Sequence, residues 1–312
     1  MRTMKAVCIY GYGGPEMLKY EDAPRPHPDA GELLIRVHAA AVNPVDWKIR
    51  EGHLKEMITP TFPLILGWDL SGVVETLGAG VARFKVGDEV FSRPDVARDG
   101  AYAEYIVVRE SEVALKPKSI DHVHAAALPL AGLTAWQSLF DAGGLSRGQR
   151  VLIHGAAGGV GTLAVQLAKE KGAFVIGTAS ARNHDFLRRL GIDQTVDYAT
   201  VRFEEAVRDV DLVFDTMGGE IQDRSWSVLK PGGILVSIAQ PPSADQAKSH
   251  GVRSAFVFTQ PNAGQLAEIA RLVEAEKLKA IVETILPLSD ATRGQELSER
   301  GHTRGKIVLR LV

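Results

Sequence analysis

Hydrophobic and polar residues follow two different patterns along this chain. In residues 1–122, short apolar segments such as Glu32 to Val42 and Leu70 to Leu77 are separated by glycine and proline. Short runs bounded by turn residues are typical of β-strands. From Arg150 onward, apolar runs alternate with segments in which apolar residues recur at helical spacing. That alternation predicts βαβ units and a doubly wound parallel sheet.

The two patterns predict two domains and an α/β fold class. We expect residues 1–122 to form a β-rich domain and residues 123–260 to form the domain with the doubly wound parallel sheet. The last segment, residues 261–312, contains an amphipathic helix with Leu266, Ile269 and Val273, followed by short β-like pieces. We expect this segment to return to the first domain, which makes that domain discontinuous.

Composition narrows the class of protein further. Of the 312 residues, 45% are hydrophobic and 24% are charged, a mixture typical of a globular protein with a large core. The formal net charge is -2 and no basic block is present, so neither nucleic acid nor a membrane is predicted as a partner. No segment approaches the roughly 20 apolar residues of a spanning helix, and no signal peptide is recognised, which predicts a cytoplasmic location. The only cysteine, Cys8, lies in an apolar run, and we expect it in the core.

A glycine-rich turn predicts a dinucleotide site. Gly155, Gly158 and Gly161 directly follow the apolar run Val151 to Ile153 and directly precede an amphipathic helix. Residues without bulk allow a tight turn and a close approach of the backbone, and the helix amino terminus then presents N–H groups to a pyrophosphate. A purely structural glycine turn is the alternative. The residues assigned to the pyrophosphate are Ala157, Gly158, Gly159 and Val160.

The end of the next apolar run predicts which dinucleotide binds. An acidic residue there would hold the ribose diol of NAD, but this sequence has no acid between Thr178 and Asp185. It offers Ser180 and Arg182 instead, and a hydroxyl and a guanidinium bind a 2′-phosphate by charge-assisted hydrogen bonds. NADPH is therefore predicted as the cofactor. In the alternative interpretation, Ser180 only caps a helix and Arg182 is a solvated surface residue.

Segments along the whole chain carry a family resemblance. In chain order they are Asn43 to Lys48, Gly67 to Gly72, Gly87 to Val90, Leu130 to Ala135, His154 to Gly161, Asp215 to Gly219 and Gly305 to Leu309. Through these segments the chain resembles the medium-chain dehydrogenase/reductase superfamily, most of all its zinc-independent quinone oxidoreductase and alkenal (enone) reductase branch. The resemblance implies a GroES-like β-rich domain and a Rossmann domain.

The sequence departs from the zinc-dependent members of this superfamily. Those members have a cysteine where Asn43 stands and a His-Glu pair after the glycine at Gly67, whereas Trp68 and Asp69 follow it here. A catalytic zinc ion needs three protein ligands of nitrogen, sulfur or oxygen type. No metal site is therefore predicted, and the scattered histidines are expected to be structural or exposed.

The resemblance also implies roles for individual residues. Lys48 and Asn43 are the candidate catalytic residues, and Lys48 resembles the alkenal/enone reductase subgroup in particular. A surface lysine in a salt bridge is the alternative interpretation of Lys48. The residues carried over as cofactor contacts are Asn43 and Thr134 near the nicotinamide, Tyr198 at the adenosine end, and the segment containing Phe256 and Val257 at the carboxamide.

These assignments predict a reductase without a metal. NADPH would deliver hydride to a quinone or to the β-carbon of an α,β-unsaturated carbonyl, and Lys48 would stabilise the oxyanion that forms. A 2-enoyl thioester reductase and a non-catalytic NADPH-binding scaffold or sensor remain as alternatives. The apolar run Phe256 to Phe258 could form an edge strand, and because exposed apolar edges are usually covered, a homodimer is expected.

Overall fold

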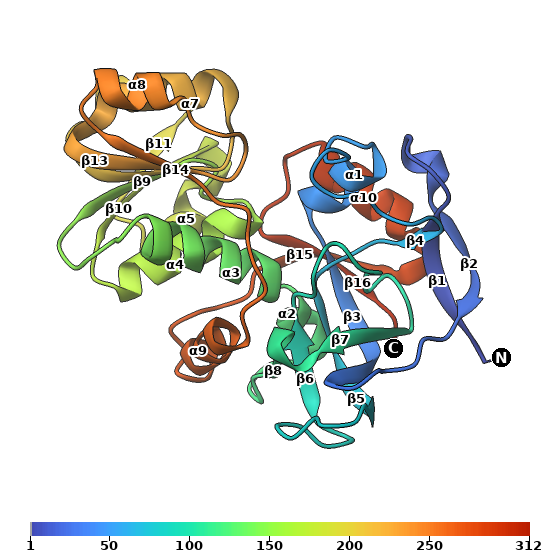
Figure 1. Ribbon diagram of the computed structural model, residues 1–312. Coiled ribbons are helices and arrows are strands. Elements are labelled where there is room, and N and C mark those ends of the chain that lie inside the picture. The colour runs from blue at the N-terminus through green and yellow to red at the C-terminus, as the bar shows by residue number, and fades with distance from the viewer. Residues whose placement is uncertain (1) are drawn as a thin grey trace. The chain divides into compact units, whose positions relative to one another are not determined.

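The computed structural model describes residues 2–312, which form two compact units (Figure 1). The first unit runs up to Leu130 and includes Gln260–Ala275 and Ala280–Val312. The second unit comprises Ala131–Thr259 and Glu276–Lys279. The division therefore falls at residue 131 and not at residue 123, and a short piece of the final segment belongs to the second unit.

Helix α2 (His122–Ala126) explains why the first unit extends past residue 122. Its apolar face packs Val123 and Ala126 against Ala39, Ala41 and Val308, all of which belong to strands of the first unit. Burial of apolar surface stabilises such a contact by roughly 25 cal/mol per Å². The helix is therefore part of the β-rich unit, although its residue pattern does not distinguish the two units.

The first unit contains two sheets. A three-stranded sheet has the order β2-β1-β4, and a seven-stranded sheet has the order β15-β16-β3-β5-β6-β8, with β7 also paired to β3. The strands are β1 (Thr3–Ile9), β2 (Lys19–Pro24), β3 (Glu32–Val42), β4 (Leu64–Ile65), β5 (Leu70–Leu77), β6 (Glu89–Ser92), β7 (Tyr105–Arg109), β8 (Val113–Leu115), β15 (Val282–Pro287) and β16 (Lys306–Arg310). Besides α2, the helices are α1 (Pro44–Arg50), α9 (Ala263–Glu274) and α10 (Ala291–Glu299).

Strand register brings three distant segments to one edge of the seven-stranded sheet. β3 runs antiparallel to both neighbours, with Val42 opposite Ile307 of β16 and Ala40 opposite Leu70 of β5. The end of β3 therefore lies beside the start of β16 and the start of β5. Gly305 precedes β16 with φ of 70°, and a Cβ there would lie 2.3 Å from the Ile281 carbonyl oxygen, so this turn requires glycine.

The second unit is a six-stranded parallel sheet of order β11-β10-β9-β12-β13-β14. This is the doubly wound order, in which the chain reverses direction across the sheet between β9 and β12. The strands are β9 (Arg150–Ile153), β10 (Phe174–Ala179), β11 (Gln194–Asp197), β12 (Val210–Asp215), β13 (Leu229–Ser237) and β14 (Arg253–Phe256). The fold class predicted from the sequence, a doubly wound sheet plus a β-rich domain, is confirmed.

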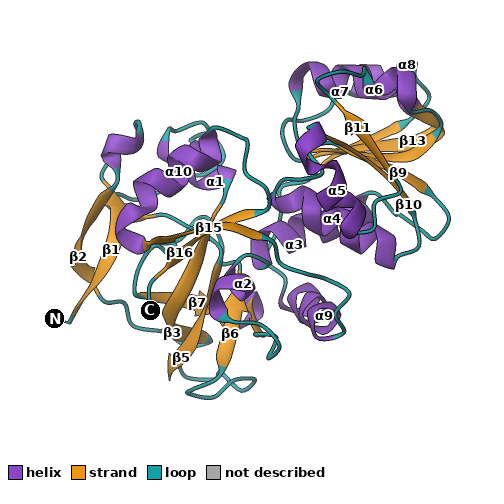
Figure 2. Cartoon of the chain, turned by 180° about the vertical axis from the view of Figure 1, so that it is seen from behind, coloured by secondary structure: helices purple, strands orange, loops and turns teal. Residues whose placement is uncertain are grey.

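Helices cover both faces of this sheet, with α4 and α5 on one side and α7 and α8 on the other (Figures 1 and 2). One face packs Leu152, Ile176 and Val213 against Trp226 and Phe203. The helices are α3 (Pro129–Trp136), which continues as a π-helical segment over Gln137–Ala142, α4 (Gly159–Glu170), α5 (His184–Arg189), α6 (Phe203–Ala206), α7 (Gly219–Ser225) and α8 (Ala244–Ser249).

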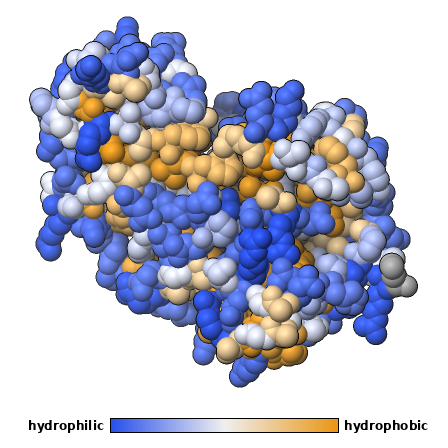
Figure 3. All heavy atoms as spheres, in the orientation of Figure 1, coloured by the Kyte–Doolittle hydropathy of each residue, from blue (hydrophilic) through white to orange (hydrophobic). Residues whose placement is uncertain are grey.

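The surface carries mostly polar residues on the face drawn in Figure 3, with apolar residues gathered in patches. Among residues 2–312, no helix has the length and apolar character needed to cross a bilayer. Cys8 lies in β1 and is 3% exposed, so its predicted place in the core is confirmed. Burial raises the pKa of its thiol to about 11, which keeps the thiol protonated at neutral pH.

Helix α1 is short, and polar contacts define its start. Asn43 is its N-cap residue, and the Asn43 backbone N–H donates to the Asp46 carboxylate at 2.7 Å. The Tyr102 hydroxyl donates to the same carboxylate oxygen at 2.7 Å. Asp46 is fully buried, and this burial raises the pKa of its carboxyl from 3.8 to about 7 against the opposing effect of these hydrogen bonds.

The raised pKa of Asp46 predicts a pH-dependent stability. The folded protein holds the Asp46 proton more tightly than the unfolded chain does, so the free energy of unfolding should fall as pH rises from about 4 to about 7. Asp46→Asn cannot ionise. From pH 4.5 to pH 8, the free energy of unfolding of this variant relative to the wild type should rise by roughly 3 kcal/mol, measured by urea denaturation.

Asp22→Asn is the matched control, because the Asp22 side chain is 60% exposed and pairs with Lys5 at the surface. Its stability relative to the wild type should change little between the two pH values. An Asp46→Asn difference that is the same at both pH values would show that Asp46 does not titrate in this range.

Candidate functional site

The glycine turn connects β9 to α4 in the second unit. The Ala156 N–H donates to the Thr178 carbonyl oxygen at 3.1 Å, and the Gly155 N–H donates to the Thr178 hydroxyl at 3.3 Å. Both bonds fasten the turn to the end of β10, where the nucleotide-selecting residues were predicted. The first N–H groups of α4 have no partner within the helix and point out of its amino terminus.

Gly158 and Gly161 of this turn differ in whether the protein itself has space for a side chain. A Cβ on Gly161 would lie 2.2 Å from the Gly155 carbonyl oxygen, so the fold itself excludes any side chain there. A Cβ on Gly158 would meet only the same oxygen, at 3.4 Å, and the Gly158 backbone is extended with φ of -76°. The protein leaves space beside Gly158 at the start of α4. This space and the adjacent N–H groups fit the pyrophosphate of a dinucleotide.

The other predicted cofactor residues lie along the same edge of the sheet. Ser180 directly follows β10, and Arg182 lies two residues further on. Tyr198 directly follows β11, Phe256 ends β14, and Val257 is the next residue. Because all six strands are parallel, their carboxyl ends share one edge, so these residues and the glycine turn form one row. Tyr198 and Phe256 are 57% and 38% exposed, which leaves both available to a ligand.

The contacts of Ser180 bear on its alternative interpretation as a helix cap. Ser180 precedes the short 3₁₀ turn Ala181–Asn183, but its side chain makes no hydrogen bond to the backbone of that turn. Its hydroxyl instead accepts from the Asn183 side-chain amide at 3.3 Å. Asp185, the first acid after β10, pairs with Arg188 at 2.6 Å on the exposed face of α5. The Asp185 carboxylate thus pairs with Arg188 and does not pair with a residue at the end of β10.

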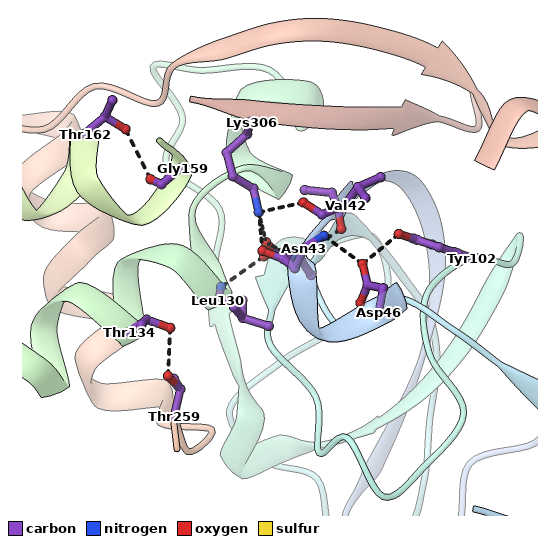
Figure 4. A network of polar contacts seen from close by, with 12 residues as sticks. Val42, Asn43, Asp46, Tyr102, Leu130, Thr134, Gly159, Thr162, Thr259 and Lys306 are labelled. Carbon is purple, nitrogen blue, oxygen red and sulfur yellow. Dashed lines mark hydrogen bonds and ion pairs between the residues drawn. The ribbon is translucent and has the colours of Figure 1, made fainter. Parts of the chain in front are cut away.

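Hydrogen bonds of Thr134 and Asp215 connect segments of the second unit that follow β12 and β14. The Thr134 hydroxyl of α3 lies 2.7 Å from the Thr259 hydroxyl, three residues beyond β14 (Figure 4). Asp215, at the end of β12, accepts from the backbone N–H groups of Met217 and Gly218, both at 2.9 Å. It also accepts from the Ser237 hydroxyl of β13 at 2.8 Å and from the Gln222 amide at 2.9 Å. In the sequence, the Asp215 segment carries only the family resemblance. The hydrogen bonds that Asp215 accepts from the following turn and from β13 were not predicted.

The two candidate catalytic residues lie in the first unit. Lys48 is half-buried on α1, its ammonium nitrogen is 5.7 Å from the centroid of the Trp47 ring, and burial lowers its pKa. The surface salt bridge considered as the alternative for Lys48 is not formed with any described residue. Asn43 is 2% exposed and occupies the place where β3 ends and α1 begins.

Asn43 belongs to a buried polar network that the sequence did not predict (Figure 4). Its amide nitrogen donates to the Asp69 carboxylate at 3.1 Å and to the Ala41 carbonyl oxygen at 3.3 Å. The Lys306 ammonium donates to the Asn43 carboxamide oxygen, and to Asp69 at 3.2 Å. The polar atoms of the Asn43 side chain thus face protein partners, which favours a positioning role for Asn43 over direct contact with substrate.

The residues at the zinc-ligand positions of the zinc-dependent members have other partners here. The Trp68 indole N–H donates to the Arg98 carbonyl oxygen at 3.0 Å, and Asp69 also accepts from the Leu130 N–H at 3.0 Å. Across residues 2–312, no three His, Cys, Asp or Glu side chains are grouped as metal ligands would be. Burial lowers the pKa of both His122 and His154 to about 4, and these two rings bond to Ser71 and to Ser225, respectively.

Comparison with known proteins agrees with this architecture. Residues 29–118 match the family described as alcohol dehydrogenase GroES-like domain, and residues 190–309 match the family described as zinc-binding dehydrogenase. The mitochondrial NAD(P)H oxidoreductase RTN4IP1 of Mus musculus is 35% identical, with 99% of this chain and 90% of that protein covered. The chloroplastic NADPH-dependent alkenal/one oxidoreductase of Arabidopsis thaliana is 36% identical, with coverage of 99% and 80%.

Solved structures extend the likeness to the whole chain. The quinone oxidoreductase from Coxiella burnetii has 38% identity and a TM-score of 0.91, with 100% of both chains covered. A mycobacterial protein solved in complex with NADPH has 30% identity and a TM-score of 0.87, with 99% of this chain and 100% of that chain covered.

The relatives also correct the predicted cytoplasmic location. The mouse relative is named mitochondrial and the Arabidopsis relative chloroplastic, so a cytoplasmic location no longer follows. Composition and the lack of a long apolar segment do not identify a compartment, because targeting segments are recognised by receptors and removed.

Family membership rests on independent observations that agree. The doubly wound sheet, its glycine turn and the β-rich first unit are those of the matched families, and the relatives are more than 30% identical over nearly the whole chain. The chain belongs to the medium-chain dehydrogenase/reductase superfamily, in its quinone oxidoreductase branch, and is a nicotinamide-dependent oxidoreductase of that family.

Proposed function

We propose that this chain is an NADPH-dependent reductase that transfers hydride to a quinone or to an α,β-unsaturated carbonyl without a metal ion. The observation that carries this proposal is the sequence after β10. Ser180 and Arg182 lie there, and no Asp or Glu occurs between Thr178 and Asp185. A carboxylate at this place would repel a 2′-phosphate, whereas a hydroxyl and a guanidinium bind it. The NADPH in the mycobacterial structure supports the same choice.

The chemistry assigns a limited task to the protein. The nicotinamide supplies the hydride when the cofactor is bound. The chain must align the acceptor and stabilise the oxygen that becomes negative, and one well-placed donor for such an oxygen is worth about 3 kcal/mol. Lys48 fits this task because it is a cation on a short, well-anchored helix, and because partial burial strengthens its interaction with a nearby anion.

The network around Asn43 supports chemistry without a metal. Asn43 and Asp69 direct their polar atoms to Lys306 and to backbone groups, and Trp68 is fully buried with its indole bonded to Arg98. Lys306 already supplies a positive charge to the two oxygen-bearing side chains. Residues 190–309 match a family of zinc-binding dehydrogenases, and the proposed reaction of this chain differs from theirs in using no metal.

Two electron acceptors, an enone and a quinone, are considered for the reduction. Lys48 and the segment Ala179 to Asn183 resemble the alkenal/enone reductase subgroup, and this resemblance favours an enone. The name of the Arabidopsis relative favours it too. The name of the Coxiella structure favours a quinone. NADPH oxidation with 1,4-naphthoquinone, short enals and a crotonyl thioester separates these classes and the thioester reductase alternative. Tight NADPH binding without turnover of any acceptor would instead support a scaffold or sensor.

A homodimer remains part of the proposal. β14 forms one end of the six-stranded sheet, and Phe256 at its end is 38% exposed. A second copy that covers this edge would pair its free backbone groups. Size-exclusion chromatography with light scattering tests this point.

Arg182→Ala tests the cofactor choice. Loss of a charge-assisted hydrogen bond to the 2′-phosphate should raise the Kd for NADPH about tenfold and leave the Kd for NADH within about twofold, measured by fluorescence titration. Arg188→Ala is the matched control, because Arg188 is an exposed arginine that pairs with Asp185 one turn further on. Wild-type protein that binds NADH more tightly than NADPH would remove the basis of the proposal.

Gly158→Ala and Gly161→Ala test the position of the pyrophosphate. The added methyl group at residue 158 meets no close protein atom, so stability should change by less than about 1 kcal/mol while NADPH affinity falls at least about tenfold. The methyl group at residue 161 collides with backbone, and should lower the free energy of unfolding by about 1–3 kcal/mol. Unchanged NADPH affinity in Gly158→Ala would move the pyrophosphate elsewhere.

Lys48→Met tests the proposed donor. Turnover of the best acceptor should fall about 100-fold because one oxyanion-stabilising group is lost, whereas the Kd for NADPH should stay within about twofold. Lys55→Met, at an exposed lysine shortly after α1, is the control. Full activity of Lys48→Met would remove Lys48 from the mechanism.

A further inference from the structure

Lys306 is buried although it carries a charge. It is 5% exposed, and its ammonium group has three N–H donors and three partners. These are the Val42 carbonyl oxygen at 3.1 Å, the Asn43 carboxamide oxygen, and the Asp69 carboxylate at 3.2 Å. The partners come from the end of β3 and the residue before β5, so one side chain joins three neighbouring strands.

Helix α1 depends on such external contacts. It has seven residues, and a helix of this length is not stable in water without tertiary contacts. At its start, Asn43 is held by Lys306 and Asp69. At its end, the fully buried Arg50 donates to the Gln295 amide oxygen of α10 at 2.6 Å and to the Gly13 carbonyl oxygen at 3.1 Å. The two ends are fixed, and Lys48 lies between them.

Stability alone does not account for a buried ion pair of this kind. Removing two charges from water offsets much of their attraction, and well-packed apolar residues often stabilise a fold equally well. What an ammonium group adds is direction, because each N–H must point at its acceptor. The contacts of Lys306 specify where the carboxamide of Asn43 lies, and Asn43 begins the helix that carries Lys48.

We propose that Lys306 is a positioning residue for the reduction: it fixes Asn43, and through Asn43 it fixes α1 and the place of the Lys48 ammonium. This inference rests on the proposed function where it concerns Lys48. Its structural half, that Lys306 holds the start of α1, does not depend on any activity. The test therefore measures the two halves separately.

Hydrogen exchange of the cofactor-free protein tests the structural half. Lys306→Met should raise the exchange rate of the amides of α1, residues 46–50, at least about tenfold. Lys116→Met is the matched control, because Lys116 is 7% exposed in the same unit and donates to the carbonyl oxygens of Pro117 and Ile120. Its loss should destabilise the protein to a similar degree and leave exchange in α1 unchanged relative to its surroundings.

Lys306→Met leaves the Asp69 carboxylate buried without its cation, and this single variant can fail to fold. Lys306→Met combined with Asp69→Asn removes both charges and avoids that penalty. Asparagine at residue 69 retains one oxygen for the Leu130 N–H. Its NH2 group replaces the oxygen that accepts from Asn43, so the Asn43 carboxamide must turn over and accept from that NH2 group. Faster exchange in α1 is expected in this double variant too. Unchanged exchange in α1 of either folded variant would overturn the proposal.

Turnover tests the catalytic half by coupling. Lys306→Met should lower kcat about tenfold with the KM for NADPH within about twofold, because a small displacement of a catalytic group is enough for such a loss. Lys306→Met together with Lys48→Met should be no slower than Lys48→Met alone, within about twofold. Losses that multiply would show that Lys306 acts independently of Lys48 and would overturn this half.

Failure of the proposed function gives a different pattern. If Lys48→Met alone keeps full turnover, Lys48 has no role, whatever the exchange data show. If Lys48→Met is slow but Lys306→Met is as active as Lys116→Met, the proposed function stands and the positioning role of Lys306 is wrong.

Discussion

Parallel strands place their carboxyl ends along one edge of a sheet, and the candidate cofactor contacts of the second unit depend on this constraint. The glycine turn after β9, Ser180 after β10, Tyr198 after β11 and Phe256 at the end of β14 come from four separate segments of the chain. They lie along one edge because each stands at the carboxyl end of a strand of the same sheet. Asp215 strengthens the arrangement, since its carboxylate ties the turn after β12 to β13.

Antiparallel register has the corresponding effect in the first unit. Because β3 runs opposite to β16 and β5, the end of β3 meets the beginning of both neighbours. Lys306 and Asp69 therefore face each other across 237 positions of the sequence. The buried ammonium and carboxylate need each other, since either alone would be an uncompensated charge in the core.

Local patterns made much of this predictable. The glycine spacing, the strand before it and the helix after it lie within a dozen residues, so the turn and the fold class followed from the sequence. The boundary at residue 131 did not, because the apolar face of α2 has the same pattern whichever unit it packs against. The partnership of Lys306 with Asp69 was also missed. Both residues lie in segments that carry the family resemblance, but nothing in the sequence indicated the strand register that brings them together.

The short helix α1 needs directional contacts at its ends, and the buried charged groups supply them. A seven-residue helix cannot define its own direction in water, so a residue that must act from it needs the helix fixed at both ends. Apolar contacts would fix the helix less sharply, because dispersion forces have little directional preference and repack at small cost. Lys306 and Arg50 instead hold the two ends through hydrogen bonds to defined oxygens. In the proposed role, the buried charges determine geometry more than stability, and the geometry they determine is that of α1 and Lys48.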